Sequence, residues 1–88
     1  MPRARKLFLS PEACSDLQTI TEPLRTVVVR RLRLLRQFPE SGVRIAGEFK
    51  GLRATTVEMF RIFYRVTLRG VEVVYIRHCK RKLFARSD

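Results

Sequence analysis

The sequence predicts an α+β domain in which two N-terminal helices pack on one face of a small antiparallel β-sheet, in the order βααβββ. Two observations lead to this prediction. Residues 10–38 repeat apolar side chains at helical spacing, whereas residues 52–79 are rich in β-branched and aromatic side chains. A chain of 88 residues can bury one core, so we expect a single domain over residues 1–88. The second face of the sheet would then be open.

The first expected elements are a short strand and a helix. The run KLFLS, at residues 6–10, is apolar enough to form the strand. Ser10 is the expected N-cap of the helix and Pro11 its first residue. Apolar residues then recur at helical spacing, which predicts one buried stripe along this helix.

A second helix is expected over residues 21–38, with Pro23 in its first turn, where proline is tolerated. Its apolar stripe is interrupted by Arg31. We expect the Arg31 stem to lie on the core while its head reaches the rim or meets Asp16 or Glu12.

Three strands are expected in the C-terminal half. Residues 39–51 form a loop with three glycines, and the strands that follow read LRATTVEMF, RIFYRVTL and VEVVYIRHC. Arg69-Gly70 is the expected two-residue turn between the last two strands.

A turn at Arg69-Gly70 fixes which residues face each other across the last hairpin. The core face would carry the opposed pairs Leu68–Val71, Val66–Val73, Tyr64–Tyr75 and Ile62–Arg77. The open face would carry the pairs Arg61–His78, Phe63–Ile76, Arg65–Val74 and Thr67–Glu72. This register therefore predicts a cluster of Arg61, His78 and Lys80 at one end of the open face, with Phe63 beside it.

The chain is strongly basic, with 19 Lys and Arg against 8 Asp and Glu, a formal charge of +11 and a pI near 11.3. Such a surface suits nucleic acid, an acidic protein or an anionic membrane. Membrane is the weakest of the three, because no apolar run approaches the roughly 18–20 residues that span a bilayer. The start MPRARK is not followed by the apolar region of a signal peptide, so a cytoplasmic location is expected.

The cysteines predict neither a metal site nor a cofactor site. Cys14 and Cys79 are far apart in a chain with one histidine, and no CxxC pair occurs. His78 and Cys79 are neighbours in an expected strand, so their side chains would point to opposite faces. Two free thiols are the expected state.

The predicted basic cluster has two interpretations. Close like charges with no acid near them in sequence favour a phosphate-binding surface, with Phe63 as a ring on which a base could stack. The alternative is a solvated strand face, which for Arg65 is equally favoured, because Glu72 lies within diagonal reach.

Three stretches resemble the RelE/ParE superfamily, the toxins of type II toxin–antitoxin modules. The first is Gly51-Leu52-Arg53, and the second is the strand Phe60-Arg61-Ile62-Phe63-Tyr64. The third runs from Val73 to Ile76 and into His78, Lys80 and Arg81. The likeness covers residues 7–84, and the superfamily fold, two helices on an antiparallel sheet, agrees with the pattern above.

The resemblance implies one of two targets. RelE-like members cut mRNA on the ribosome without a metal, and this interpretation assigns Arg61, His78 and Arg81 as catalytic. It assigns as substrate-binding the residues Lys50, Arg53, Phe63, Lys80, Lys82 and Phe84. Phe84 stands near the position where many RelE members have a tyrosine, and Leu52 and Ala54 occupy the region of their strand lysines.

ParE-like members instead inhibit DNA gyrase as binding proteins without nuclease activity. The Gly51-Leu52-Arg53 spacing suits them equally, whereas the charge of +11 favours ribosomal RNA and mRNA, so the ribosome-dependent endoribonuclease is the favoured function. Either toxin implies a cognate antitoxin, expected as an acidic amphipathic segment on the open face. A basic nucleic-acid-binding module without toxicity is the third alternative.

Overall fold

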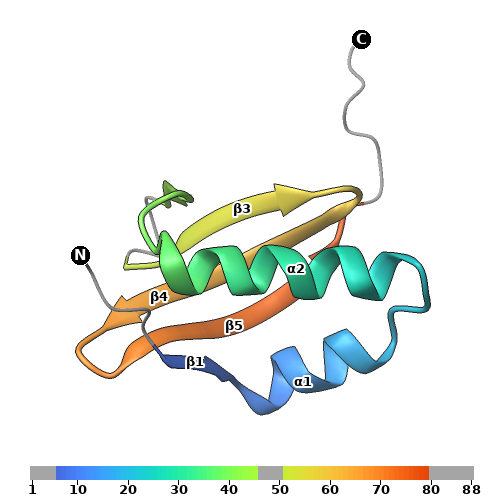
Figure 1. Ribbon diagram of the computed structural model, residues 1–88, viewed down its shortest axis with the longest axis horizontal. Helices are drawn as coiled ribbons and strands as arrows, with labels where there is room; N and C mark the ends of the chain where they lie inside the picture. The colour runs from blue at the N-terminus through green and yellow to red at the C-terminus, as the bar shows by residue number, and fades with distance from the viewer. Residues whose placement is uncertain (1–5, 46–50, 80–88) are drawn as a thin grey trace, which may run out of the picture.

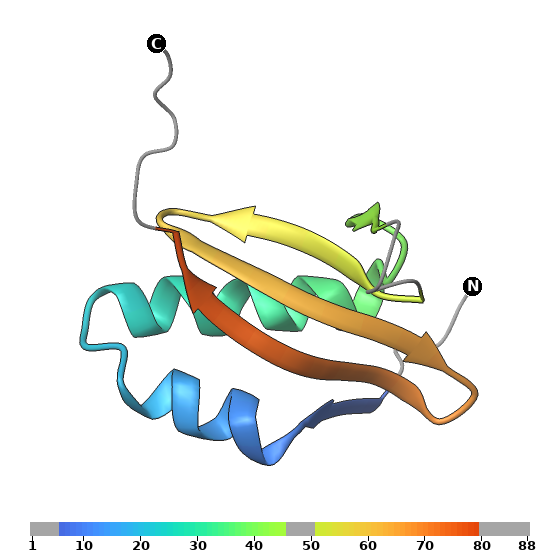
Figure 2. The ribbon, with the colours of Figure 1, turned by 180° about the vertical axis from the view of Figure 1, so that it is seen from behind.

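The computed structural model describes residues 6–45 and 51–79, which form two helices packed on one face of a five-stranded sheet (Figure 1). The elements are β1 (Lys6–Leu9), α1 (Pro11–Gln18), α2 (Leu24–Gln37), β2 (Val43–Arg44), β3 (Arg53–Val57), β4 (Phe60–Thr67) and β5 (Gly70–His78). The strand order is β1-β5-β4-β3-β2. Seen from behind, β3, β4 and β5 lie in front of the helices, so that the second face of the sheet is turned to the viewer (Figure 2).

The predicted α+β class and the two-helix layer are confirmed, with two differences in the sheet. The sheet is mixed rather than antiparallel, because β1 pairs in parallel with β5. The chain crosses from β1 through both helices to the far edge and returns as a four-strand meander, whose three reversals bring β5 back in the direction of β1. The short β2 at that far edge was not predicted.

The first helix begins as its sequence predicts. The Ser10 hydroxyl accepts the backbone N–H of Ala13 at 3.0 Å, and Pro11 is the first helical residue. The second helix begins at Leu24, where a Glu22 carboxylate oxygen accepts from the Thr26 hydroxyl at 2.7 Å and from the Thr26 N–H at 3.1 Å. Each helix start therefore uses a side-chain oxygen in place of a missing backbone acceptor.

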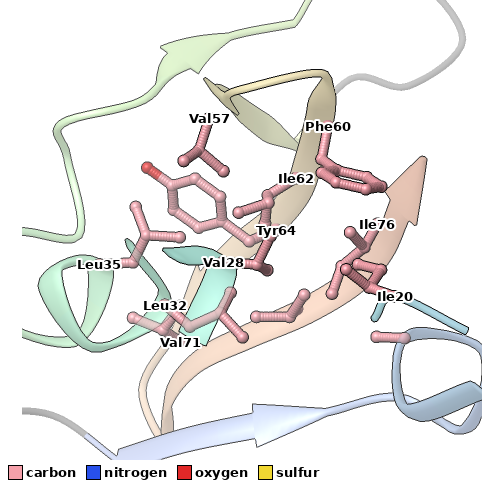
Figure 3. Packing of buried hydrophobic residues seen from close by; sticks show 12 residues of the cluster. Ile20, Val28, Leu32, Leu35, Val57, Phe60, Ile62, Tyr64, Val71 and Ile76 are labelled. Atoms are coloured by element: carbon pink, nitrogen blue, oxygen red, sulfur yellow. The ribbon is translucent and has the colours of Figure 1, made fainter. Parts of the chain in front are cut away.

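The core lies between the helices and the inner face of β4 and β5 (Figure 3). Its helical side includes Ala13, Val28, Leu32 and Leu35. Its sheet side includes Phe60, Ile62, Tyr64, Val71, Val73 and Ile76. Burial of these side chains is the main stabilising contribution, on the order of 1.5–3 kcal/mol for each large apolar side chain.

Arg31 reaches the sheet rather than the first helix. One of its guanidinium nitrogens donates to the Thr55 hydroxyl at 3.0 Å and to the Thr56 carbonyl at 3.1 Å. The residue is half-buried, and its hydrogen-bond partners are Thr55 and Thr56 rather than Asp16 or Glu12. Asp16 is instead used by β5, where its carboxylate accepts the Ile76 N–H at 3.0 Å.

The hairpin register differs from the prediction at both ends. The turn is Leu68-Arg69, with Thr67 opposite Gly70, and Leu68 is fully exposed at the tip. Gly70 pairs with Thr67 on one side and with Lys6 of β1 on the other. A side chain there would run into the Lys6 backbone, so the position requires glycine.

A β-bulge at Val74 then shifts the register by one residue. Tyr64 faces Val73 but Phe63 faces Tyr75, so Val74 is the extra residue. Beyond it, every β5 side chain has the opposite facing from the predicted one. Ile76 enters the core, whereas Tyr75 and Arg77, predicted for the core face, lie on the open face.

The first helix holds the bulge in place. The Ser10 hydroxyl, besides capping α1, donates to the Val74 carbonyl at 2.7 Å, and the Ser10 N–H donates to the Val73 carbonyl at 2.9 Å. Together with the Asp16–Ile76 bond, these contacts satisfy backbone groups that an irregular ladder leaves without partners. The bulge is thus fixed by residues about sixty positions earlier in the chain.

Candidate functional site

The open face of the β4–β5 hairpin carries two opposed pairs of unusual composition. Arg61 faces Arg77, and next to them Phe63 faces Tyr75. Both arginines are exposed and both rings are half-buried. The face therefore presents two cations and two aromatic rings side by side.

Each of the two rings is in cation–π contact with one arginine guanidinium. The Arg61 Cζ lies 5.5 Å from the centre of the Phe63 ring, and the Arg77 Cζ lies 4.4 Å from the centre of the Tyr75 ring. The two rings meet edge to face, with centroids 6.5 Å apart and planes at 80°. Contacts of this kind orient the guanidinium groups without neutralising them. We call Arg61, Phe63, Tyr75 and Arg77 the arginine–aromatic patch.

The arginines of the two strands on this face differ in whether a carboxylate pairs with them. Near the hairpin turn, Arg65 lies opposite Glu72, and the two form an ion pair with an N···O distance of 3.0 Å. This ion pair, predicted as one interpretation of Arg65, neutralises that arginine. Arg69, in the turn, lies over the Phe8 ring at 4.6 Å from its centre. Within residues 6–45 and 51–79, neither Arg61 nor Arg77 has a carboxylate partner. Like charges directly opposite each other are unfavourable, so the Arg61–Arg77 pair favours an anion.

His78 does not join Arg61. The predicted pair Arg61–His78 is wrong, because the bulge at Val74 moves the register and places Phe60 opposite His78. The imidazole packs against the Phe60 ring with centroids 5.4 Å apart, on the face opposite to Arg61. The residue opposite Arg61 is Arg77, which the sequence analysis did not predict as a site residue. The pair Ile76-Arg77 could have indicated it, because of two neighbouring strand residues the apolar one is the better candidate for the core.

Arg53 is engaged with the loop that precedes β2. Its guanidinium donates to the Gly42 carbonyl at 2.9 Å and to the Glu40 carbonyl at 3.5 Å, and the side chain is half-buried. The remaining predicted site residues, Lys50, Lys80, Arg81, Lys82 and Phe84, lie outside the described residues.

The patch can bind and orient an anion but offers few groups for proton transfer. The Tyr75 phenol is its one titratable group apart from the arginines. Among the described residues, no three His, Cys, Asp or Glu side chains come together as metal ligands. Cys14 is exposed and Cys79 half-buried, and both thiols are free. No helix in the described part of the chain is long and apolar enough to cross a membrane.

Several solved structures with a similar fold come from toxin–antitoxin systems. The chain superimposes on a chain of the RelBE2 complex from Mycobacterium tuberculosis with a TM-score of 0.80 at 19% identity, covering 86% of this chain and 99% of the other. A chain of the chromosomal ParDE system from P. aeruginosa gives 0.71 at 20% identity, with 88% and 98% covered. The E. coli RelBE complex gives 0.73 at 15% identity, with 89% and 100% covered.

The sequence itself matches a family model. No curated protein is significantly similar to this chain. Residues 7–83, however, match the model described as the ParE toxin of the type II toxin–antitoxin system parDE. With this match over most of its length and with the fold above, the chain belongs to the ParE toxin family, within the RelE/ParE superfamily of type II toxins.

Proposed function

We propose that this toxin stops translation by cutting mRNA on the ribosome, in the cytoplasm, with the arginine–aromatic patch as its substrate surface. The observation that carries the proposal is the exposed pair Arg61–Arg77, two cations that face each other with no ion-pair partner in the described structure. A phosphodiester between them would relieve their repulsion and accept hydrogen bonds from both guanidinium groups.

The proposed reaction is attack by a ribose 2′-hydroxyl on the adjacent phosphorus. The bond from the 2′-oxygen to phosphorus forms, the bond from phosphorus to the 5′-oxygen breaks, one proton leaves the 2′-hydroxyl and one reaches the 5′-oxygen. Negative charge grows on the phosphoryl oxygens in the transition state, where Arg61 and Arg77 would stabilise it. The protein would also align the 2′-oxygen with the leaving group.

The groups that we propose for proton transfer come after Arg77 in the sequence. His78 lies on the other face of the hairpin from Arg61, so it would reach the phosphate only around the end of β5. Lys80, Arg81 and Lys82 follow directly in the sequence and remain candidates for phosphate binding or proton transfer. Arg81 would complete the catalytic set with Arg61.

A second candidate function is inhibition of DNA gyrase by binding alone. Two observations favour it: the matching family model is that of a ParE toxin, and the histidine is not beside Arg61. In this case the patch would contact an acidic surface of the target, and no chemistry would be required of it.

We also propose that the toxin is held inactive by a cognate antitoxin. Structural relatives were solved as toxin–antitoxin complexes, RelBE2 and ParDE among them. A charge of +11 favours an acidic partner segment, and covering the arginine–aromatic patch would neutralise the toxin directly.

Cell-free translation with added toxin, followed by primer extension on the mRNA, tests the function. Codon-phased cuts that disappear in Arg61→Ala and Arg81→Ala would support the nuclease. Arg65→Ala is the matched control, because Arg65 lies on the same strand and face but is paired with Glu72. Uncut mRNA together with blocked supercoiling by purified gyrase would reject the nuclease in favour of the second candidate.

A further inference from the structure

We propose that Phe63 and Tyr75 form a stacking site for an unpaired nucleobase, through which the isolated toxin binds single-stranded RNA without the ribosome. The inference deepens the proposed function and depends on it for the choice of RNA as the nucleic acid. It assigns a role to Tyr75 and Arg77, which the sequence had placed on the core face, and gives Phe63 a partner ring.

The geometry of the two rings suits a base. They come from adjacent strands, meet edge to face at 6.5 Å, and are half-buried, so their positions are set by the sheet rather than by solvent. A planar base can stack on either ring, and aromatic side chains on an open sheet are a common platform for unpaired bases. The guanidinium groups lie 5.5 and 4.4 Å from the ring centres, within reach of the phosphates that flank such a base.

The arrangement of the two rings depends on an irregularity in the sheet, the β-bulge at Val74. Tyr75 reaches the open face only because Val74 bulges, and the bulge is held by Ser10 and Asp16. Bulges commonly redirect a side chain next to a functional site. The Arg65–Glu72 ion pair neutralises the arginine nearer the turn, whereas Arg61 and Arg77, beside the two rings, have no ion-pair partner among the described residues.

RNA fits this surface better than an acidic protein segment does. Carboxylate side chains would satisfy Arg61 and Arg77 but would bring no aromatic ring to stack with Phe63 or Tyr75. A nucleotide supplies both the negative charge and the ring, at the spacing of a single residue of the polymer.

Tyrosine fluorescence reports on this site directly. The chain has two tyrosines and no tryptophan. Tyr64 is fully buried and Tyr75 is on the open face, so a stacked base should quench the Tyr75 emission. The probe is a short oligouridylate, compared with an abasic ribose-phosphate strand of the same length, in titrations of the full-length toxin at fixed salt.

Stacking predicts quenching by the oligouridylate and about tenfold weaker binding of the abasic strand, without quenching. Phe63→Ala and Tyr75→Ala should each weaken oligouridylate binding about tenfold in fluorescence anisotropy. Tyr75→Trp should keep the affinity and strengthen the signal, and Arg65→Ala should change the affinity less than about twofold. Thermal unfolding of each variant shows that it is folded.

Equal affinity for the abasic strand would overturn the proposal, because binding would then depend on phosphate alone. Displacement of the oligouridylate by polyglutamate, with a polyglutamate affinity that Phe63→Ala does not change, would also overturn the proposal. That result would indicate an acidic protein partner. The result is separable from that of the cleavage test. Base-dependent binding with uncut mRNA would reject only the nuclease, whereas codon-phased cleavage with equal affinity for the abasic strand would reject only the stacking site.

Discussion

The hydroxyl of Tyr64 joins the middle of the sheet to the loop that follows α2, by accepting the Gly42 N–H at 2.8 Å. The same hydroxyl donates to the Pro39 carbonyl, also at 2.8 Å. Tyr64 has no exposed surface and Gly42 is buried. Arg53 holds the same loop by donating to the Gly42 carbonyl. The position where α2 gives way to β2 is therefore set by hydrogen bonds from the sheet.

Replacing Tyr64 by phenylalanine should lower the free energy of unfolding by about 1–3 kcal/mol, because the buried Gly42 N–H loses its acceptor. Urea denaturation measures the change. Tyr75→Phe is the matched control and should stay within about 0.5 kcal/mol, since the half-exposed Tyr75 hydroxyl can bond to water. Equal stability of Tyr64→Phe and the wild type would show that the loop is held by Arg53 alone.

Gly42→Ala tests the same contact from the loop side. An added Cβ would lie 2.5 Å from the Tyr64 hydroxyl oxygen and 2.8 Å from the Ala54 carbonyl oxygen, so the loop would have to move. The two changes should couple: the double variant should lose less stability than the sum of the single variants, because both break the same bond. Additive losses would contradict this.

Salt should stabilise the protein, and Arg77 should account for part of the effect. Repulsion between Arg61 and Arg77 costs about 0.2–1 kcal/mol, and added NaCl screens it. Arg77→Thr should change stability little at low salt, because the contact with Tyr75, worth about 0.5–1 kcal/mol, is lost as the repulsion is relieved. The rise of stability with NaCl concentration should be smaller in this variant.

The control for the salt experiment is Arg65→Thr. It removes an attraction to Glu72 rather than a repulsion, so it should lower stability at low salt and steepen the rise with salt. Identical salt profiles for Arg77→Thr and the wild type would mean that Arg61 and Arg77 do not repel each other appreciably.

Acidification should weaken the start of α2. The pKa of Glu22 lies below its ordinary value, first because of the hydrogen bond from the Thr26 hydroxyl and then because of that from the Thr26 N–H. A carboxyl with a lower pKa in the folded than in the unfolded chain stabilises the fold above the unfolded pKa, near 4.3. That stabilisation is lost as the pH falls through the folded pKa.

Glu22→Gln cannot be protonated in this range, so its Tm should fall less than that of the wild type between about pH 5 and pH 2. Thr26→Val removes the hydroxyl donor, so its Tm should also fall less than that of the wild type over this pH range. Parallel Tm profiles for the wild type and Glu22→Gln would exclude Glu22 as a source of the acid sensitivity.

Ser10→Ala should cost about 1–2 kcal/mol, because one hydroxyl both caps α1 and bonds to the bulge. Ser15→Ala, at an exposed position of the same helix, is the control and should have an effect within about 0.5 kcal/mol. If the bulge depends on Ser10, the variant should also bind the oligouridylate more weakly. A loss of stability with unchanged binding would limit Ser10 to its capping role.

Local chemistry made most of the fold predictable. The cap at Ser10, the helix layer and the buried positions of Ile62 and Tyr64 follow from residue types and spacing, and the structure confirms them. The open-face site was not predictable from the same rules. The bulge that directs Tyr75 and Arg77 outward depends on contacts from α1, about sixty residues away, and no periodicity within β5 encodes such contacts.

In the candidate site, too, positions set by local alternation were predictable and positions set by distant contacts were not. Arg61 was placed correctly on the open face, because it precedes the bulged region and alternation along β4 is regular. Arg53 appeared to be a surface cation in the sequence, but the structure has it bonded to loop carbonyls, a use that depends on where the α2–β2 loop passes. Sequence alone could not locate that loop.

The bulge also has a consequence for comparing this chain with its relatives. Val74 is one residue more than a regular ladder between β4 and β5 can hold. Tyr75 and Ile76 therefore have the facing that they would have in a regular strand one residue shorter. A relative with one residue fewer between Val73 and Tyr75 would present the same two faces. An alignment of two such chains should therefore open its gap at Val74, even where an ungapped alignment scores better, because only the gapped one superimposes equivalent side chains.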